Sequence, residues 1–147
     1  METDSIREAN IKQKLKKIDS ETNIINWFEI PVSDLKRAKM FYETILDIEM
    51  TLRNEGEAEG AFFPYNPKVT QATSGRVTGV LSKSNRNTPS GNGTMVYINA
   101  SPDLQLVLNK VEKAGGKIVM PKTVMPFGSI AVIIDSEGNR IGLHAEK

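Results

Sequence analysis

One strand-to-helix junction occurs twice in this chain of 147 residues. Ser33-Asp34-Leu35 follows an apolar strand pattern in the first half, and Ser101-Pro102-Asp103-Leu104 follows another in the second half. At both places a short polar side chain can cap a helix, and apolar residues then recur at helical spacing. The repetition predicts two modules of the same kind, each opening with a strand and a helix.

Residues 23–84 are the first predicted module. Apolar and polar side chains alternate from Trp27 to Pro31, as in a strand with two differently occupied faces, and a helix capped by Ser33 or Asp34 follows. The aromatic run Phe62-Phe63-Pro64-Tyr65 predicts core packing, with a pocket wall or a module interface as the alternatives. Clusters of Asn, Gly and Pro separate three further expected strands, Ile48 to Arg53, Gly60 to Tyr65 and Arg76 to Ser84.

The second module repeats this order. We expect a strand over Thr94 to Asn99 and a helix over Pro102 to Ala114 that ends at Gly115-Gly116. Three strands then follow, Lys117 to Met120, Ser129 to Asp135 and Arg140 to Ala145. The turn Ser136-Glu137-Gly138-Asn139 joins the last two strands.

The first 22 residues differ from the rest of the chain. Ile11, Leu15 and Ile18 recur at helical spacing, which predicts a short amphipathic helix that packs on the domain, contacts a partner or frays. Residues 23–147 then form one domain. It consists of module one (23–84), a connector rich in Asn, Ser, Gly and Pro (85–93), and module two (94–147).

Composition narrows the classes of partner. Lys and Arg number 19 against 18 acidic residues, so the net charge of +1 provides no broad field for nucleic acid or an anionic membrane. No apolar run reaches the roughly 18 residues of a membrane helix, and the N-terminus lacks a secretory signal pattern. Cysteine is absent, which fits a reducing compartment. We therefore expect a cytoplasmic protein that binds neither nucleic acid nor membrane.

Three motifs together carry a resemblance to a known family. They are Pro31-Val32-Ser33-Asp34-Leu35 with Phe41-Tyr42, Pro102-Asp103-Leu104 with Ala114-Gly115-Gly116, and Asp135-Ser136-Glu137-Gly138-Asn139-Arg140-Ile141. The sequence resembles a small two-module member of the vicinal oxygen chelate superfamily, which includes glyoxalase I, bleomycin resistance proteins and extradiol dioxygenases. The resemblance covers residues 23–146 and implies an α+β fold in which two βαβββ modules form a curved mixed sheet. Its concave cavity would hold a small molecule, often in a homodimer.

The resemblance also indicates where metal ligands would stand. Metal-dependent relatives carry His, Gln or Glu on the first and last strand of each module. The matching residues here are Trp27, Met95 and Gly142, and the strand over 79–83 contains no carboxylate or imidazole. A divalent ion needs several oxygen or nitrogen donors, and a thioether is a poor substitute. We therefore expect no metal site of the usual kind and no other cofactor.

Strand alternation predicts which other side chains share these faces. Candidates for contact with a ligand lie on the same faces as the former ligand positions: Trp27, Met95, Tyr97 and Asn99. Trp27 suggests a platform on which a flat ligand stacks, although a tryptophan in a strand is more often plain core.

Two titratable side chains are candidates for catalysis. Glu29 shares the face of Trp27 and stands among apolar neighbours, so it is either a base or polar anchor, or an ordinary exposed or ion-paired residue. His144, the only histidine, shares the face of Gly142, and its pKa range suits proton transfer. It is otherwise a solvent-facing residue near the C-terminus. The sequence predicts that Glu29, Tyr97 and His144 converge on one cavity.

Three functions stay open on this basis. The first is a glyoxalase or bleomycin resistance-like protein that has lost its metal-ligand positions and binds a small, partly apolar molecule as a homodimer. The second is an enzyme, a lyase or isomerase of the glyoxalase type that uses Glu29 or His144 and a divalent metal held by nonstandard ligands. The third is a protein-interaction module with a vestigial cavity.

Overall fold

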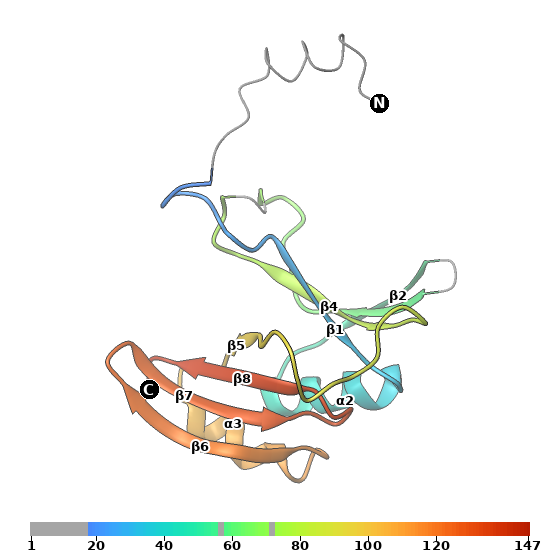
Figure 1. The fold of residues 1–147 in the computed structure, drawn as a ribbon. Coiled ribbons are helices and arrows are strands. Elements are labelled where there is room, and N and C mark those ends of the chain that lie inside the picture. The colour runs from blue at the N-terminus through green and yellow to red at the C-terminus, as the bar shows by residue number, and fades with distance from the viewer. Residues whose placement is uncertain (1–17, 56–57, 71–72) are drawn as a thin grey trace.

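The computed structural model describes residues 18–55, 58–70 and 73–147. Within this part of the chain each module has the order strand, helix and three strands (Figure 1). Module one contains β1 (Trp27–Pro31), α2 (Leu35–Leu46), β2 (Thr51–Glu55), β3 (Ala58–Phe62) and β4 (Thr78–Lys83). Module two contains β5 (Tyr97–Asn99), α3 (Leu104–Val111), β6 (Lys117–Met125), β7 (Gly128–Ile134) and β8 (Arg140–Ala145). The predicted α+β fold of two βαβββ modules is confirmed.

Each module builds its own four-stranded mixed sheet. The strand orders are β1-β4-β3-β2 and β5-β8-β7-β6, so the first strand of each module lies at an edge beside the last strand. That pair is parallel in both modules, and the other neighbours are antiparallel. The repetition seen in the sequence is thus a repetition of topology.

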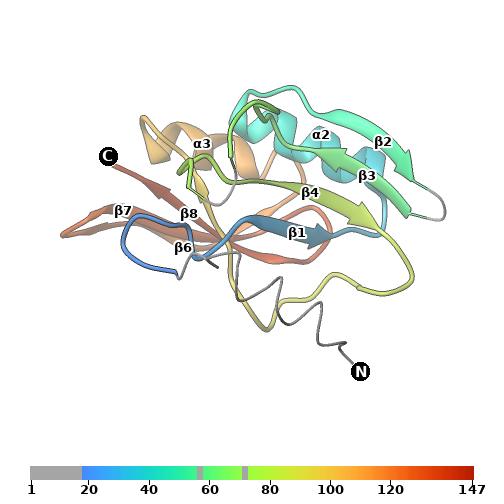
Figure 2. The same cartoon turned by 90° about the horizontal axis from the view of Figure 1, so that it is seen from above.

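The two helices join the modules into one core. The helix α2 packs on the sheet of module one, α3 packs on that of module two, and the helices contact each other (Figure 2). Buried apolar side chains from both modules form a single cluster. Its largest fully buried members are Tyr42, Phe41, Ile45, Leu81, Leu104, Ile133, Leu143 and Val111. Burial of this apolar surface is the main force that holds the modules together.

Both helices begin at an aspartate. Asp34 accepts a hydrogen bond from the backbone N–H of Arg37 (3.0 Å) at the start of α2, and Asp103 accepts one from that of Gln105 (3.0 Å) at the start of α3. Such caps satisfy backbone N–H groups that have no partner within the helix. The helix of module two therefore begins at Leu104, later than predicted, because Asp103 provides the cap.

A glutamate from module two also reaches the start of α2. The Glu137 carboxylate lies in the turn between β7 and β8 and accepts hydrogen bonds from Ser33 N (3.0 Å), Asp34 N (2.8 Å) and Arg37 Nε (2.7 Å). Its side chain is fully buried, with an exposed fraction of 0%. Burial would raise the pKa of Glu137, but the hydrogen bonds from Arg37 and the two backbone N–H groups outweigh it and lower the pKa.

The same turn holds β1 in place. The Asn139 side-chain N–H donates to the backbone carbonyl of Pro31 (2.7 Å) and to Asp135 Oδ2 (3.0 Å). The Tyr42 hydroxyl also donates to Asp135 Oδ2 (2.7 Å). Burial and the neighbouring Asp135 carboxylate raise the pKa of Tyr42, so the hydroxyl keeps its proton. The motif from Asp135 to Ile141, one of the three that carry the family resemblance, is therefore a contact between modules.

Several boundaries differ from the prediction. The strand β3 ends at Phe62, before Pro64, and β5 begins only at Tyr97. The strand β6 continues to Met125, beyond the predicted end at Met120. It lies at the edge of its sheet, where a proline need not cost a ladder hydrogen bond, and Pro121 falls within one of the two register shifts, the one between Met120 and Thr123.

The predicted N-terminal helix over residues 1–22 lies mostly outside the described residues. Of that segment the structure describes residues 18–22, which contain a turn in which Thr22 N donates to Asp19 O. No helix in the described part of the chain is long and apolar enough to cross a membrane.

Candidate functional site

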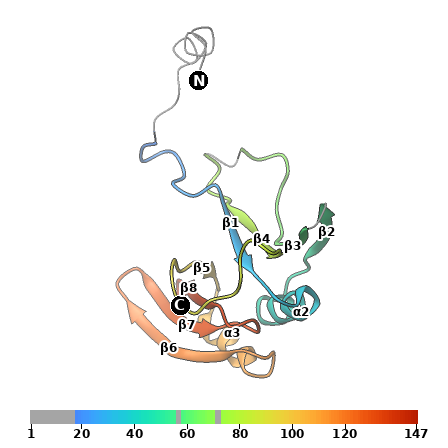
Figure 3. The same cartoon turned by 45° about the vertical axis from the view of Figure 1, so that its right-hand side comes forward.

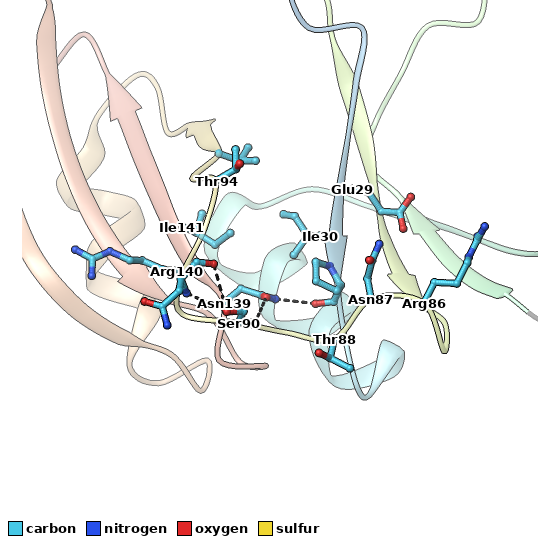
Figure 4. Close-up of a pocket in the computed structure, with 13 residues that line it drawn as sticks. Glu29, Ile30, Arg86, Asn87, Thr88, Ser90, Thr94, Asn139, Arg140 and Ile141 are labelled. Carbon is cyan, nitrogen blue, oxygen red and sulfur yellow. Dashed lines mark hydrogen bonds between the residues drawn. The ribbon is translucent and has the colours of Figure 1, made fainter.

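Each sheet has one face on the core and one face without a helix, which we call its open face. In β1 the side chain of Ile30 points toward module two, whereas Glu29 points to the opposite side (Figure 4). In β8 the side chain of Arg140 extends away from β1 (Figure 4). Because Arg140 shares a strand face with Gly142 and His144, the two open faces are turned away from each other within one chain. Figure 3 shows the two sheets standing apart on either side of the connector.

The open face of module one carries three aromatic rings in contact, which we call the aromatic row. The ring of Trp27 lies 5.6 Å from that of Phe62, and Phe62 lies 6.2 Å from Tyr65, measured between centroids. Trp27 is 44% exposed and Tyr65 is 46% exposed. The guanidinium carbon of Arg53 stands 5.6 Å from the Phe62 centroid. The face therefore offers flat apolar surface next to a positive charge.

In module two a single tyrosine ring covers the corresponding place on the open face. The ring of Tyr97 lies on Gly142, so close that a Cβ atom at Gly142 would meet ring carbons at 2.6 Å. The register pairs these two residues side by side on the open face. Gly142 is buried as a result, and Tyr97 itself stays 50% exposed.

Matching hydrogen bonds align the modules residue by residue. The N–H after the first strand donates to the last strand in both, from Val32 to Ser82 (3.0 Å) and from Ala100 to His144 (2.7 Å). Counting back from these residues pairs the positions that the resemblance assigns to metal ligands, Trp27 with Met95 and Val80 with Gly142. The position in 79–83 that the sequence left open is thus Val80.

These four residues do not fit the metal centre of metal-dependent relatives. An indole, a valine and a glycine supply no side-chain lone pair suited to a divalent ion, and the Tyr97 ring occupies the space above Gly142. In the described residues no three His, Cys, Asp or Glu side chains cluster as a metal site would require.

A cavity of about 600 Å³, which we call the apolar cavity, lies between β5 and module one. Module one contributes Phe28 and Phe63, whose rings are 5.4 Å apart, together with Pro64, Val77 and Thr78. The remaining lining residues are Ile25 and the consecutive residues Thr94, Met95, Val96, Tyr97, Ile98 and Asn99. Strand alternation predicted Met95, Tyr97 and Asn99 as ligand contacts, and the structure brings these three together.

A second cavity of about 640 Å³ is polar (Figure 4). It lies between β1, the connector and the start of β8, and Glu29, Arg86 and Arg140 are its charged lining residues. No hydrogen bond or ion pair joins Glu29 to another described residue. Figure 4 shows Arg86 and Arg140 extending in different directions, so the two cations do not converge on one ligand.

His144 lines neither of these two cavities. Its Nε2 is 3.0 Å from the backbone carbonyl of Phe127, and the two rings are stacked with centroids 6.0 Å apart. Because a carbonyl only accepts, Nε2 carries the proton, and Nδ1 keeps its lone pair when the ring is neutral. The expected convergence of Glu29, Tyr97 and His144 does not occur within one chain, since the open faces diverge.

The structure places further residues at these sites that strand alternation did not predict. Phe62 and Arg53 join Trp27 on the open face of module one, and Phe28 and Phe63 line the apolar cavity. The dense run from Phe62 to Tyr65 was the signal in the sequence for Phe62 and Phe63, and no such signal pointed to Arg53 or Phe28. Phe62 and Tyr65 of that run contact each other on the open face, whereas Phe63 and Pro64 line the apolar cavity, so a single run supplies both places.

Comparison with known proteins agrees with this geometry. Residues 24–143 match the Glyoxalase/Bleomycin resistance protein/Dioxygenase superfamily, and the chain belongs to that family. A search among curated proteins finds no match.

Solved structures share the fold. A glyoxylase/bleomycin resistance protein/dioxygenase domain from Frankia sp. is 17% identical with a TM-score of 0.61, and the alignment covers 85% of this chain and 98% of that one. A glyoxalase/bleomycin resistance protein from Albidiferax ferrireducens is 18% identical with a TM-score of 0.60, over 85% and 100% of the chains. Glyoxalase I from Zea mays is 18% identical with a TM-score of 0.57, over 82% of this chain and 45% of that one. At these identities the similarity concerns the fold alone.

Proposed function

We propose that this protein binds a small, flat, partly apolar molecule on the open face of module one, and that it does so without the metal ion of metal-dependent relatives. The observation that carries the proposal is the aromatic row of Trp27, Phe62 and Tyr65. Exposed aromatic rings in mutual contact are unusual on a monomeric surface and mark a place where something binds. Stacking on such rings is favourable for any flat ligand.

The charges near the aromatic row favour an anionic group on the ligand. Arg53 stands over Phe62, so a carboxylate or phenolate attached to a stacked ring would lie beside a guanidinium. Glu29 shares the open face on the side of β1 and would repel an anion there. The two charges together orient such a ligand with its anionic end toward β2.

We also propose that two copies of the chain enclose this ligand. Within one chain the open faces of modules one and two are turned apart, so neither face closes a cavity alone. A homodimer that sets module one of one copy against module two of the other would cover the aromatic row and the exposed Tyr97. The same pairing would bring Glu29 of one copy and His144 of the other to one space, which is the arrangement that a lyase or isomerase would need.

Because Trp27 is the only tryptophan, its indole N–H gives one resonance that reports on the site. We would titrate the 15N-labelled protein with 2-naphthoate, a flat aromatic anion, and with 2-naphthamide, its neutral counterpart. We expect the indole resonance to shift in a saturable way, with tighter binding of the anion. Arg53→Gln should remove the preference for the anion, and Phe62→Leu should lower the affinity for both ligands.

A matched control distinguishes binding at the open face of module one from nonspecific binding of the two compounds. Val124→Leu changes an apolar side chain on β6 that is 78% exposed, and it should leave both titrations unchanged. An indole resonance that does not shift with either compound would refute the proposed site. Sedimentation equilibrium tests the homodimer separately, since a monomer across the micromolar range would exclude the enclosing dimer and leave the binding result standing.

A further inference from the structure

The apolar cavity is a separate place from the aromatic row. Trp27 and Phe28 are neighbours in β1, so their side chains lie on opposite faces of the sheet, and only Phe28 lines the cavity. A ligand that stacks on Trp27 therefore does not fill this space. Its volume of about 600 Å³ falls within the range of small-molecule sites in proteins.

We infer that the apolar cavity is a second binding site, which takes an uncharged and largely apolar molecule with an oxygen atom at one end, such as a medium-chain alcohol, ketone or ester. The lining decides the charge of this ligand. None of the 12 lining residues is charged, whereas the polar cavity of similar volume has Glu29, Arg86 and Arg140 in its wall. Placing an ion in the apolar cavity would cost solvation energy that no lining residue returns.

The oxygen atom of the ligand is inferred from the hydrogen-bond donors among the residues that line the cavity. Asn99 Oδ1 already accepts from Ser101 N (2.9 Å), which orients the amide so that its NH2 group is the free end. No hydrogen bond among the described residues uses that NH2 group or the hydroxyls of Tyr97 and Thr94. Thr78 is different, because its hydroxyl donates to the Pro64 carbonyl (2.9 Å).

The residues that carry these free groups belong to one wall of the cavity. Thr94, Tyr97 and Asn99 belong to one continuous segment around β5, and the opposite wall consists of Phe28, Phe63 and their neighbours. The wall around β5 therefore contributes all three of these residues, next to Met95, Val96 and Ile98, whereas the opposite wall is mainly aromatic and apolar. A molecule with one acceptor oxygen and an apolar body satisfies both walls at once, which a hydrocarbon or a polyol would not.

The test uses three probes of the same length and different charge: 1-octanol, octanoate and octylammonium. Binding is measured on the full chain from methyl 1H–13C shifts of Ile25, Val77 and Val96. We expect saturable shifts with 1-octanol and affinities at least about tenfold weaker for the two ions. Tyr97→Phe, which removes only the hydroxyl, should weaken the binding of 1-octanol by about threefold to tenfold, and unchanged affinity would contradict the inferred hydrogen bond to the ligand oxygen.

Val77→Asp and Val124→Asp form a matched pair. Both introduce one carboxylate, but only Val77 lines the cavity, while Val124 is exposed on β6. The inference expects Val77→Asp to abolish 1-octanol binding and Val124→Asp to preserve it, with circular dichroism confirming that both variants fold. Equal affinity for all three probes, or unchanged binding by a folded Val77→Asp, would overturn the inference. Binding of 1-octanol that disappears as a dimer forms would overturn it too, because a second copy would then be the occupant.

Discussion

Module one exposes a row of aromatic rings on its open face, whereas module two lays one tyrosine ring onto a glycine. Both modules have the same strand order, the same parallel pairing and an aspartate at the start of the helix. The difference lies in the side chains on the faces that no helix covers. The fold constrains the core faces and the caps of both modules, and it leaves the open faces free to diverge.

The starts of the two helices differ in a second way. The helix α2 receives the buried Glu137 carboxylate from module two, whereas the first N–H of α3 donates to the backbone carbonyl of Lys147 (2.9 Å). Module one therefore depends on a side chain from module two, and module two completes its own helix. Substitutions at these places can show how far the modules are independent.

The largest expected effect compares two glycines that lie in the last strand of each module. A Cβ atom at Gly79 would lie 2.3 Å from the carbonyl oxygen of Phe28, a backbone atom of the paired strand β1. The three atoms nearest to a Cβ atom at Gly142 all belong to the ring of Tyr97, a side chain that is half exposed and can rotate away. We expect Gly79→Ala to cost about 3 kcal/mol in free energy of unfolding and Gly142→Ala about 1 kcal/mol, measured by urea denaturation. Equal costs would mean that the Tyr97 ring is as rigid as backbone.

Removing the contact between modules comes next. Glu137→Ala leaves Ser33 N and Asp34 N without their acceptor and Arg37 without its partner, so we expect a loss of about 2–3 kcal/mol. Glu146→Ala, the same change at an exposed glutamate near the C-terminus, should stay within about 0.5 kcal/mol. A loss at Glu137 no larger than at Glu146 would show that the modules hold together through the apolar core alone.

The same carboxylate predicts how stability depends on pH. Because the folded-state pKa of Glu137 is lowered, its contribution is complete above the ordinary glutamate pKa and is lost as pH falls through the lowered value. A hydrogen bond from Met50 N lowers the pKa of Glu43 in the same direction. We expect stability to fall as pH drops below the ordinary glutamate pKa, and Glu137→Gln to flatten this dependence more than Glu43→Gln does. Parallel curves for wild type and Glu137→Gln would contradict the assignment.

The sequence was sufficient for the fold because the fold depends on patterns within each segment. Caps, strand alternation and the glycine pair after α3 all act over a few residues, and the elements they predict are present. The site was predicted less well for two reasons. Strand alternation assigns a side chain to one face of its sheet. Whether the faces of two sheets converge depends on the angle between the sheets, and that angle comes from the packing of α2 on α3. The covering of Gly142 by Tyr97 is likewise a contact between neighbouring strands, which no spacing along the chain reveals.

The smallest expected effect tests whether the support from Glu137 is shared with the aspartate that caps α2. Asp103→Ala removes the side-chain cap of α3 and should cost about 1 kcal/mol, whereas Asp34→Ala should cost only about 0.5 kcal/mol because Glu137 still accepts from the backbone there. In a chain that already carries Glu137→Ala, the cost of Asp34→Ala should rise to that of Asp103→Ala. Urea denaturation of the single and double variants gives this coupling. An Asp34→Ala cost that is the same in both backgrounds would mean that the two carboxylates act on α2 independently.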